Sequence, residues 1–254
     1  MFSKIFYIMD TKKTKKNKMK KYQMSDKIHF IENLDKDTGW METWDKGRSI
    51  GCIPHSFRLL ALGGCGRGKT MQMKQIFLKH QMSNIPFKYL YIICPDAEES
   101  KEWDDCQPSD VFDYIPDLNI ITGDDKSLII IDDFEFKKMN KEDEKKLTTL
   151  FRFVSTHKNC SLMASYQSFF DCPSLLRKVS NVFIIYKPNS KLELQSIANR
   201  VGIEFEILKQ CFKKYSSGYH DSIMIDMTKN TPAKIRKNIY EVIEYQSDSD
   251  SDDE

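Results

Sequence analysis

The chain has 254 residues, of which 40% are hydrophobic and 30% charged, and its formal net charge is +2. At about 100 to 200 residues per domain, this length fits one large or two small domains, and the composition excludes a wholly disordered or a fibrous protein. No apolar run approaches the roughly 20 residues of a membrane-spanning helix, so we expect no membrane span. The short apolar segment at residues 1–9 is followed by a lysine run instead of a small-residue cleavage site, so we expect no secretory signal.

The two ends of the chain differ in charge. Residues 12–21 contain seven lysines, whereas residues 247–254 contain five acidic residues. A basic body with an acidic end favours a polyanionic partner, and two solvated ends without a partner are the alternative. We expect residues 1–27 to form a flexible basic arm, 28–55 an N-terminal extension and 246–254 a disordered acidic tail.

From residue 56 onward, short aliphatic or β-branched runs alternate with longer amphipathic stretches. This alternation is typical of βα units around a mostly parallel sheet, and almost continuously apolar runs indicate strands that helices cover on both faces. We therefore predict one α/β domain at 56–245. In chain order, the expected elements are strand 57–62, helix 69–82, strands 88–94 and 128–131, helix 141–156, strands 161–166 and 182–186, helices 191–201 and 204–215, and a last strand at 222–227.

The segment after the first predicted strand matches the G-x-x-x-x-G-K-T pattern in full. Its glycines let the backbone wrap around a phosphate chain, the amides of the helix N-terminus face the anion, and Lys69 adds a positive charge. We expect the Thr70 hydroxyl to bind Mg²⁺. A glycine-rich turn that binds nothing is the alternative. The predicted nucleotide-binding residues are Gly63, Gly64, Cys65, Gly66, Arg67, Gly68, Lys69 and Thr70.

An acidic pair follows the predicted strand at 128–131. We expect Asp132 to help hold Mg²⁺ and Asp133 to polarise an attacking water, with Glu135 as a second candidate for the catalytic acid. An ordinary turn or helix cap would also explain two adjacent aspartates. Because parallel strands present their carboxyl ends at one edge of a sheet, we expect this pair to lie beside the phosphate loop.

A further strand, 88–94, separates the two motifs in the sequence. We expect it to lie between their strands in the sheet, which resembles the additional-strand class of P-loop NTPases with its RecA-like motors and differs from nucleoside kinases and small GTPases. Gln167 ends the strand at 161–166. In RecA-like motors such a residue contacts the γ-phosphate or the attacking water, and a surface glutamine is the alternative.

These motifs, together with the run at 157–161, the stretch from Pro173 to Arg177 and the strand at 222–226, resemble the poxvirus-type genome-packaging ATPases. That family belongs to the FtsK–HerA superfamily of DNA-pumping motors and occurs in large cytoplasmic DNA viruses and virophages. The resemblance spans residues 50–240. The phosphate loop and acidic pair are shared by many NTPases. The segments from residue 157 onward are therefore what distinguishes this family from other NTPases.

The resemblance implies ATP hydrolysis with Mg²⁺ that drives double-stranded DNA, whatever its sequence, into a preformed capsid. It further implies a homo-oligomeric ring, capsid or portal-vertex proteins as partners, and a location in the host cytoplasm, in the viral factory, at the capsid vertex or in the virion. In such rings a neighbouring subunit inserts an arginine that stabilises the transition state.

Seven arginines are present in the chain, and Arg177 is our first choice for the inserted one, followed by Arg152 and Arg200. Each could instead form a salt bridge on a helix surface. Family members often carry an arginine where this chain has Thr156. This difference weakens a direct assignment of the inserted arginine from the family to this chain.

Basic stretches at 12–21, 137–146 and 229–237 are candidate DNA contacts, although acidic residues in the middle stretch favour a solvated helix face. Seven cysteines are spread without a C-x-x-C pair, which favours reduced thiols. Two other functions fit the same motifs: a helicase or conjugation-type DNA pump of this superfamily, and a nucleotide-binding assembly protein that does not hydrolyse ATP.

Overall fold

The computed structural model describes residues 53, 55–82, 86–95, 101–134, 136, 139–228 and 234–244. All of them belong to one compact unit, Gly39–Glu254. The predicted basic arm, the acidic tail and most of the predicted extension lie outside the described residues, so these three predictions and the limits of the ATPase domain stay predictions.

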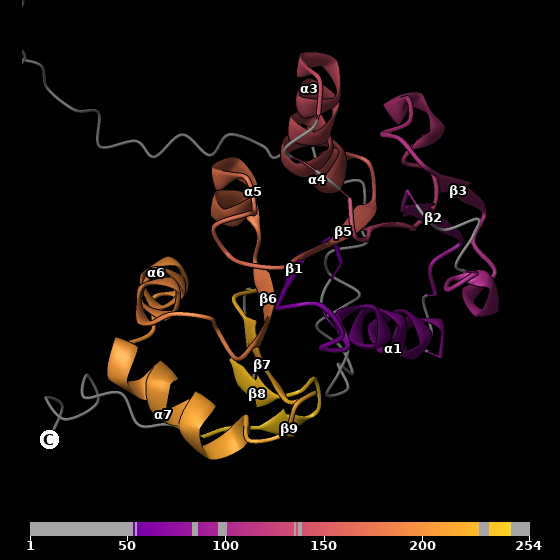
Figure 1. Ribbon diagram of the computed structural model, residues 1–254. Helices are drawn as coiled ribbons and strands as arrows, with labels where there is room; N and C mark the ends of the chain where they lie inside the picture. Colours follow the sequence, from indigo (N-terminus) through magenta and orange to yellow (C-terminus); the bar gives the residue numbers. More distant parts are fainter. Residues whose placement is uncertain are drawn as a thin grey trace, which may run out of the picture. The chain divides into compact units, whose positions relative to one another are not determined.

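A nine-stranded sheet forms the centre of the domain, in the order β3-β2-β4-β5-β1-β6-β7-β8-β9 (Figure 1). The strands from β3 to β6 are parallel, and β7, β8 and β9 add antiparallel neighbours at one end. Their bounds are β1 Arg58–Leu62, β2 Tyr89–Ile93, β3 Asp110–Phe112, β4 Ser127–Ile131, β5 Cys160–Tyr166, β6 Val182–Tyr186, β7 Ser222–Asp226, β8 Ile235–Lys237 and β9 Glu241–Val242.

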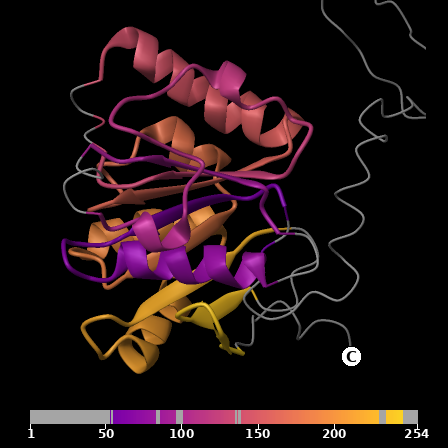
Figure 2. The same cartoon turned by 90° about the vertical axis from the view of Figure 1, so that its right-hand side faces the viewer.

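Helices cover both faces of this sheet, which is why its central strands are apolar along their whole length. One core cluster joins alternate strand residues to α1, and the other joins the opposite residues to α3, α5, α6 and α7. Figure 2 shows α1 and the α3 layer on opposite sides of the sheet. The helices are α1 Lys69–Gln81, α3 Lys141–Thr149, α4 Ser155–His157, α5 Ser174–Val179, α6 Lys191–Val201 and α7 Phe205–Tyr215, with short 3₁₀ turns at Asp104–Cys106 and Leu118–Ile120.

The predicted place of the extra strand is wrong, although an extra strand exists. The strand between the phosphate-loop strand β1 and the acidic strand β4 is β5, and β2 lies on the far side of β4. Pairing is set by contacts distant in sequence, so the chain order of two strands does not fix their order in the sheet. The additional-strand arrangement is confirmed, with β5 as the inserted strand.

The predicted helix at 141–156 is a composite of α3, a π-helical turn at Leu150–Val154 and α4. Ser155 and Thr156 follow the π turn, and their hydroxyls donate to carbonyls four residues earlier at 2.9 Å. Such back-bonding often bends a helix, and π turns occur mostly as single turns within α-helices. Sequence periodicity also missed β3 and α5, and β7 is followed by β8 and β9.

Two other expectations concern absent features. No helix among the described residues is long and apolar enough to cross a membrane. The six cysteines that the structure describes are all free thiols.

Candidate nucleotide site

The phosphate loop lies between β1 and α1, and two of its glycines are required by geometry. A Cβ on Gly63 would lie 2.7 Å from the Cβ of Tyr186 on β6, a contact that real structures do not show. Gly68 precedes α1 with a φ of 98°, in the left-handed region that glycine adopts without strain. The loop therefore holds the curved conformation that the sequence pattern predicts.

The N-terminus of α1 suits an anion. The residue that precedes the helix offers no side-chain cap, and the first turn carries no acidic residue. The first amides of a helix have no partner within it and bear partial positive charge, so they attract phosphate. Lys69 is 6% exposed, and its Nζ donates to the Gly64 carbonyl at 3.2 Å. Its ammonium group therefore lies over the loop, where a phosphate would sit.

Three side chains from three elements meet at the end of β4. The hydroxyl of Thr70 donates to Asp132 Oδ2 at 2.8 Å, and the hydroxyl of Ser165 donates to Asp132 Oδ1 at 2.6 Å. Ser165 lies on the inserted strand β5, and its oxygen also accepts the Asp133 amide at 3.1 Å. Sequence analysis missed Ser165, because a strand sequence does not show which strands pair with it, and the pairing of β5 with β4 brings Ser165 beside Asp132.

The Asp132 carboxylate is 2% exposed. Burial raises its pKa above the ordinary value, while the hydrogen bonds from Ser165 and Thr70 act in the opposite direction. A buried carboxylate beside a hydroxyl is the oxygen-donor set that Mg²⁺ prefers when it also binds substrate phosphates. Thr70 and Asp132 therefore fit the predicted metal site, since a cation would offset the cost of this buried charge.

Asp133 differs from its neighbour. It is exposed, and its φ of 48° lies in the left-handed region that side chains rarely adopt. Such a conformation costs about 1 to 3 kcal/mol and is concentrated at functional sites. It turns the chain at the edge where the phosphate loop lies, so Asp133 remains the candidate for polarising water. Glu135, the second candidate, lies outside the described residues.

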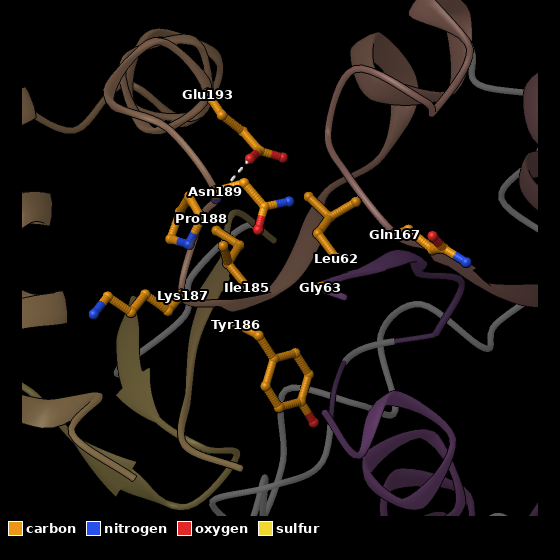
Figure 3. A pocket seen from close by; sticks show the side chains of 9 residues that line it. All are labelled: Leu62, Gly63, Gln167, Ile185, Tyr186, Lys187, Pro188, Asn189 and Glu193. Carbon is orange, nitrogen blue, oxygen red and sulfur yellow. Dashed lines mark hydrogen bonds between the residues drawn. The ribbon is translucent and has the colours of Figure 1, made fainter. Parts of the chain in front are cut away.

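Gln167 follows β5 directly. Because β5 lies between β1 and β4, Gln167 lies between the phosphate-loop strand and the acidic strand at the carboxyl end of the sheet. Its exposed side chain makes no hydrogen bond to a described residue. Gln167, Gly63 and Glu193 line a small cavity of about 10 Å³ (Figure 3). A contact of Gln167 with the γ-phosphate or the attacking water stays a prediction.

The three candidate arginines lie in different settings. Arg200 donates to the carbonyls of Arg177, Lys178 and Ser180 and so closes the C-terminus of α5. That role is structural, because these carbonyls have no partner within the helix. Arg177 is half-buried with its guanidinium 4.9 Å from the centre of the Phe169 ring. Arg152 is exposed on the π turn, so Arg152 and Arg177 remain the candidates.

A loop that sequence analysis did not identify holds the phosphate loop from the side. The guanidinium of Arg67 stacks on the ring of Tyr219 at 4.2 Å from its centre and donates to the Tyr219 carbonyl at 3.1 Å. The Tyr219 hydroxyl reaches the Cys65 carbonyl at 3.5 Å, and His220 Nδ1 lies 3.1 Å from the Arg67 carbonyl. No sequence pattern predicts this contact, because the residues lie far apart in the chain.

A cleft of about 870 Å³ opens beside this loop. Cationic side chains border it, and the aromatic rings of Phe205 and Tyr219 form part of its wall. The ammonium groups of Lys191 and Lys209 each lie 5.6 Å from the centre of the Phe205 ring. The basic residues that line the cleft are Arg67, Lys187, Lys191, Lys209 and Lys213.

Two predicted DNA-contact stretches are described in part. Lys146 on α3 pairs with Glu142 at 3.1 Å, as expected for a solvated helix face. Arg236 on β8 is 2% exposed and pairs with the buried Asp226 at 3.0 Å, so this arginine belongs to the core. The stretch at 12–21 and residues 229–233 lie outside the described residues.

No protein-family model and no curated protein sequence matches the chain. Among solved structures, the chain is similar to the genome-packaging NTPase B204 of Sulfolobus turreted icosahedral virus 2 in complex with AMPPCP, with 16% identity, a TM-score of 0.50, and coverage of 74% of this chain and 98% of that one. The cytoplasmic domain of the Type VII secretion ATPase EccC of Thermomonospora curvata has 11% identity and a TM-score of 0.48, with coverage of 78% and 26%. The likeness to B204 shows the fold, and the predicted RecA-like P-loop NTPase class is confirmed.

Proposed function

We propose that the protein is an ATPase motor that drives double-stranded DNA into a preformed viral capsid. The observation that supports this most directly is the convergence of Lys69, Thr70, Asp132 and Gln167 at one edge of the sheet. A protein that only stored a nucleotide would have no need of a residue at the γ-phosphate or of a strained carboxylate such as Asp133.

The site residues have separate roles in this proposal. The amides of the phosphate loop and the Lys69 ammonium bind the phosphates, while Thr70 and Asp132 would hold Mg²⁺. The bound ion would neutralise charge that develops on the β- and γ-phosphates. Asp133 orients and polarises the attacking water, and Gln167 contacts the γ-phosphate or that water. Positioning and charge supply most of the catalysis in such reactions.

In this proposal the nucleoside would lie on the opposite side of the phosphate loop. Thr70, Asp132 and Gln167 mark the γ-phosphate end on the side of β4 and β5, so the chain of phosphates leads away toward β6. The basic cleft beside Tyr219 opens there. Its aromatic wall and cationic rim suit a planar base attached to an anion.

Duplex DNA is the load that we propose for the motor, with a homo-oligomeric ring as the working assembly. The family resemblance supports it, as does the basic charge of the chain outside its acidic end. The fold-level likeness to a viral genome-packaging NTPase adds the same expectation. Capsid or portal-vertex proteins would then be partners in the host cytoplasm.

The test is ATP turnover by the purified full-length protein with and without double-stranded DNA, at low and moderate salt, beside Lys69→Ala and Asp133→Asn. We expect duplex DNA to stimulate turnover and both variants to abolish it. Turnover that is indifferent to DNA would contradict the proposed load. Tight binding of ATP without turnover would favour an assembly protein, and separation of DNA strands would favour a helicase.

A further inference from the structure

Glu193 is a buried carboxylate that joins two loops of the nucleotide site. It lies in the first turn of α6 and is 4% exposed. Its Oε1 accepts the Phe169 amide at 2.7 Å and the Ser168 hydroxyl at 2.9 Å, and its Oε2 accepts the Asn189 amide at 3.0 Å. One side chain thus ties the loop after β5 to the loop after β6.

Helix capping explains only part of this arrangement. Ser190 precedes α6 and its hydroxyl accepts the Glu193 amide at 3.1 Å, which is half of the S-x-x-E capping box. In that motif the glutamate would bond back to the amide of the capping serine. Here its carboxylate reaches the Asn189 amide and crosses to Ser168 and Phe169 in another loop. Those two bonds contribute nothing to the helix end.

The loop that Glu193 holds begins at Gln167. Because the Gln167 side chain has no hydrogen bond to a described residue, its position depends on the backbone next to it. Ser168 is the next residue, and its hydroxyl oxygen also accepts the Phe170 amide at 3.1 Å. The cavity between these loops, about 10 Å³, has room for about one water molecule. The loops therefore cannot shift separately without breaking bonds to Glu193.

We propose that Glu193 is a positioning residue for Gln167: its carboxylate fixes the loop after β5 so that Gln167 faces the γ-phosphate. In Figure 3 the Glu193 carboxylate is directed toward Asn189, and Gln167 extends beyond Leu62 and Gly63. The Glu193 carboxylate bonds to Ser168, Phe169 and Asn189, and none of these belongs to the proposed phosphate or metal site. Its loss should therefore change the rate of the chemical step and leave nucleotide binding intact. This inference rests on the proposed ATPase function.

Glu193→Gln is the informative change, because it keeps the shape of the side chain. A glutamine offers one oxygen where the carboxylate offers two, and its amide group places a donor against the Asn189 amide or against the Phe169 amide. We expect kcat for ATP to fall about 10- to 100-fold, because a small misplacement of a catalytic group lowers the rate by about this factor. We expect KM for ATP to stay within about twofold, since the phosphate loop is unchanged.

Ser190→Ala is the matched control. It removes the cap of the same helix but leaves the bonds from Ser168 and Phe169 to Glu193. It should lower the melting temperature, because the helix loses its cap, while kcat stays within about twofold of the wild type. A folding defect in α6 would lower kcat in both variants, whereas the proposed role lowers it in Glu193→Gln alone.

Hydrogen exchange of the full-length protein provides a readout that does not depend on hydrolysis. In Glu193→Gln the amide that faces the new donor group, that of Phe169 or that of Asn189, should exchange faster, and in Ser190→Ala the amide of Phe169 should keep its protection. The proposal is overturned if Glu193→Gln keeps kcat near the wild-type value, or if both amides keep their protection. A wild type that does not hydrolyse ATP would contradict the proposed function instead, and exchange at Phe169 would still decide whether Glu193 fixes the loop.

Discussion

The hydroxyl of Thr70 on α1 donates to the carboxylate of Asp132 at 2.8 Å, although β5 separates β1, the strand before the phosphate loop, from β4 in the sheet. The bond joins the first turn of α1 to the end of β4. It holds the Thr70 hydroxyl next to the Asp132 carboxylate, and these two groups would bind Mg²⁺. Asp132 is buried, and hydrogen bonds from Ser165 and Thr70 and the charge of Lys69 favour its charged form. A bound cation would add to this stabilisation.

Thr70→Ala removes this hydroxyl and leaves the carboxylate without one of its two side-chain donors. We expect turnover of ATP to fall about 100-fold, a typical effect of losing one preorganised polar contact to a transition state, and the concentration of Mg²⁺ needed for half-maximal rate to rise. Thr70→Ser keeps the hydroxyl and should retain most of the activity. The assignment fails if Thr70→Ala depends on Mg²⁺ as the wild type does.

Gly63→Ala tests the packing beneath the phosphate loop. The added Cβ would meet the Tyr186 side chain at 2.7 Å, so the loop or β6 must shift, and overpacking of this kind costs about 1 to 3 kcal/mol. Gly64→Ala is the control, because a Cβ there has nothing within 4 Å. Urea unfolding of both variants should show the larger loss of unfolding free energy in Gly63→Ala, and equal losses would contradict the close approach of Tyr186.

The sequence predicts those parts of the fold that depend on local pattern. The bounds of β6 and α6 agree with prediction, because β6 is a continuous apolar run and α6 begins after Ser190 and ends before Gly202. The phosphate loop and Asp132 are equally local, since each follows an apolar strand within a few residues.

Features that depend on contacts between distant segments could not be predicted from local sequence pattern. The insertion of β5 beside β1, the contact of Tyr219 with Arg67, and the Glu193 bridge all join residues far apart in the chain. Ser190 and Glu193 do form an S-x-x-E pattern, which signals a helix start. It gives no sign that the glutamate turns toward another loop.

Tyr219→Ala tests whether the loop before β7 holds the phosphate loop. Loss of the stack on Arg67 should weaken ATP binding about fivefold, since an exposed cation–π contact contributes about 1 kcal/mol. Tyr219→Phe keeps the ring and loses only the contact to the Cys65 carbonyl, so its affinity should stay within about twofold. Titration with a non-hydrolysable ATP analogue measures both, and equal affinities of Tyr219→Ala and wild type would contradict the role.

Mixing experiments test which arginine acts across a subunit interface. Arg177→Ala keeps an intact phosphate loop, and Lys69→Ala keeps Arg177, so each variant alone should be inactive. If Arg177 acts in a neighbouring site, a mixture of the two should recover turnover, because an arginine supplied in this way contributes about 10³ to 10⁵ in rate. Recovery with Arg152→Ala in place of Arg177→Ala would assign the role to Arg152. A mixture that stays inactive while mixed assemblies form would contradict action between subunits.

Acid should destabilise the protein through two buried histidines at the other edge of the sheet. Nδ1 of His55 lies 2.6 Å from the Ser161 hydroxyl and its Nε2 lies 2.7 Å from Asn159 Oδ1, an arrangement that suits the neutral ring. Burial, helped by the charge of Lys126, lowers the pKa of His55 to about 3. Burial also lowers the pKa of His80 well below its ordinary value.

The direction of this pH effect on stability follows from the unfolded chain, in which histidine has a pKa of about 6.5. The stability that neutral His55 contributes is complete above that pH and is lost as the pH falls toward 3, because the unfolded chain then binds the proton more tightly. Between pH 7.5 and 5.5, urea unfolding should show a loss of about 1 kcal/mol for each of the two histidines. His55→Gln, which cannot titrate, should remove about half of that loss, and an unchanged loss in this variant would exclude His55 as its source.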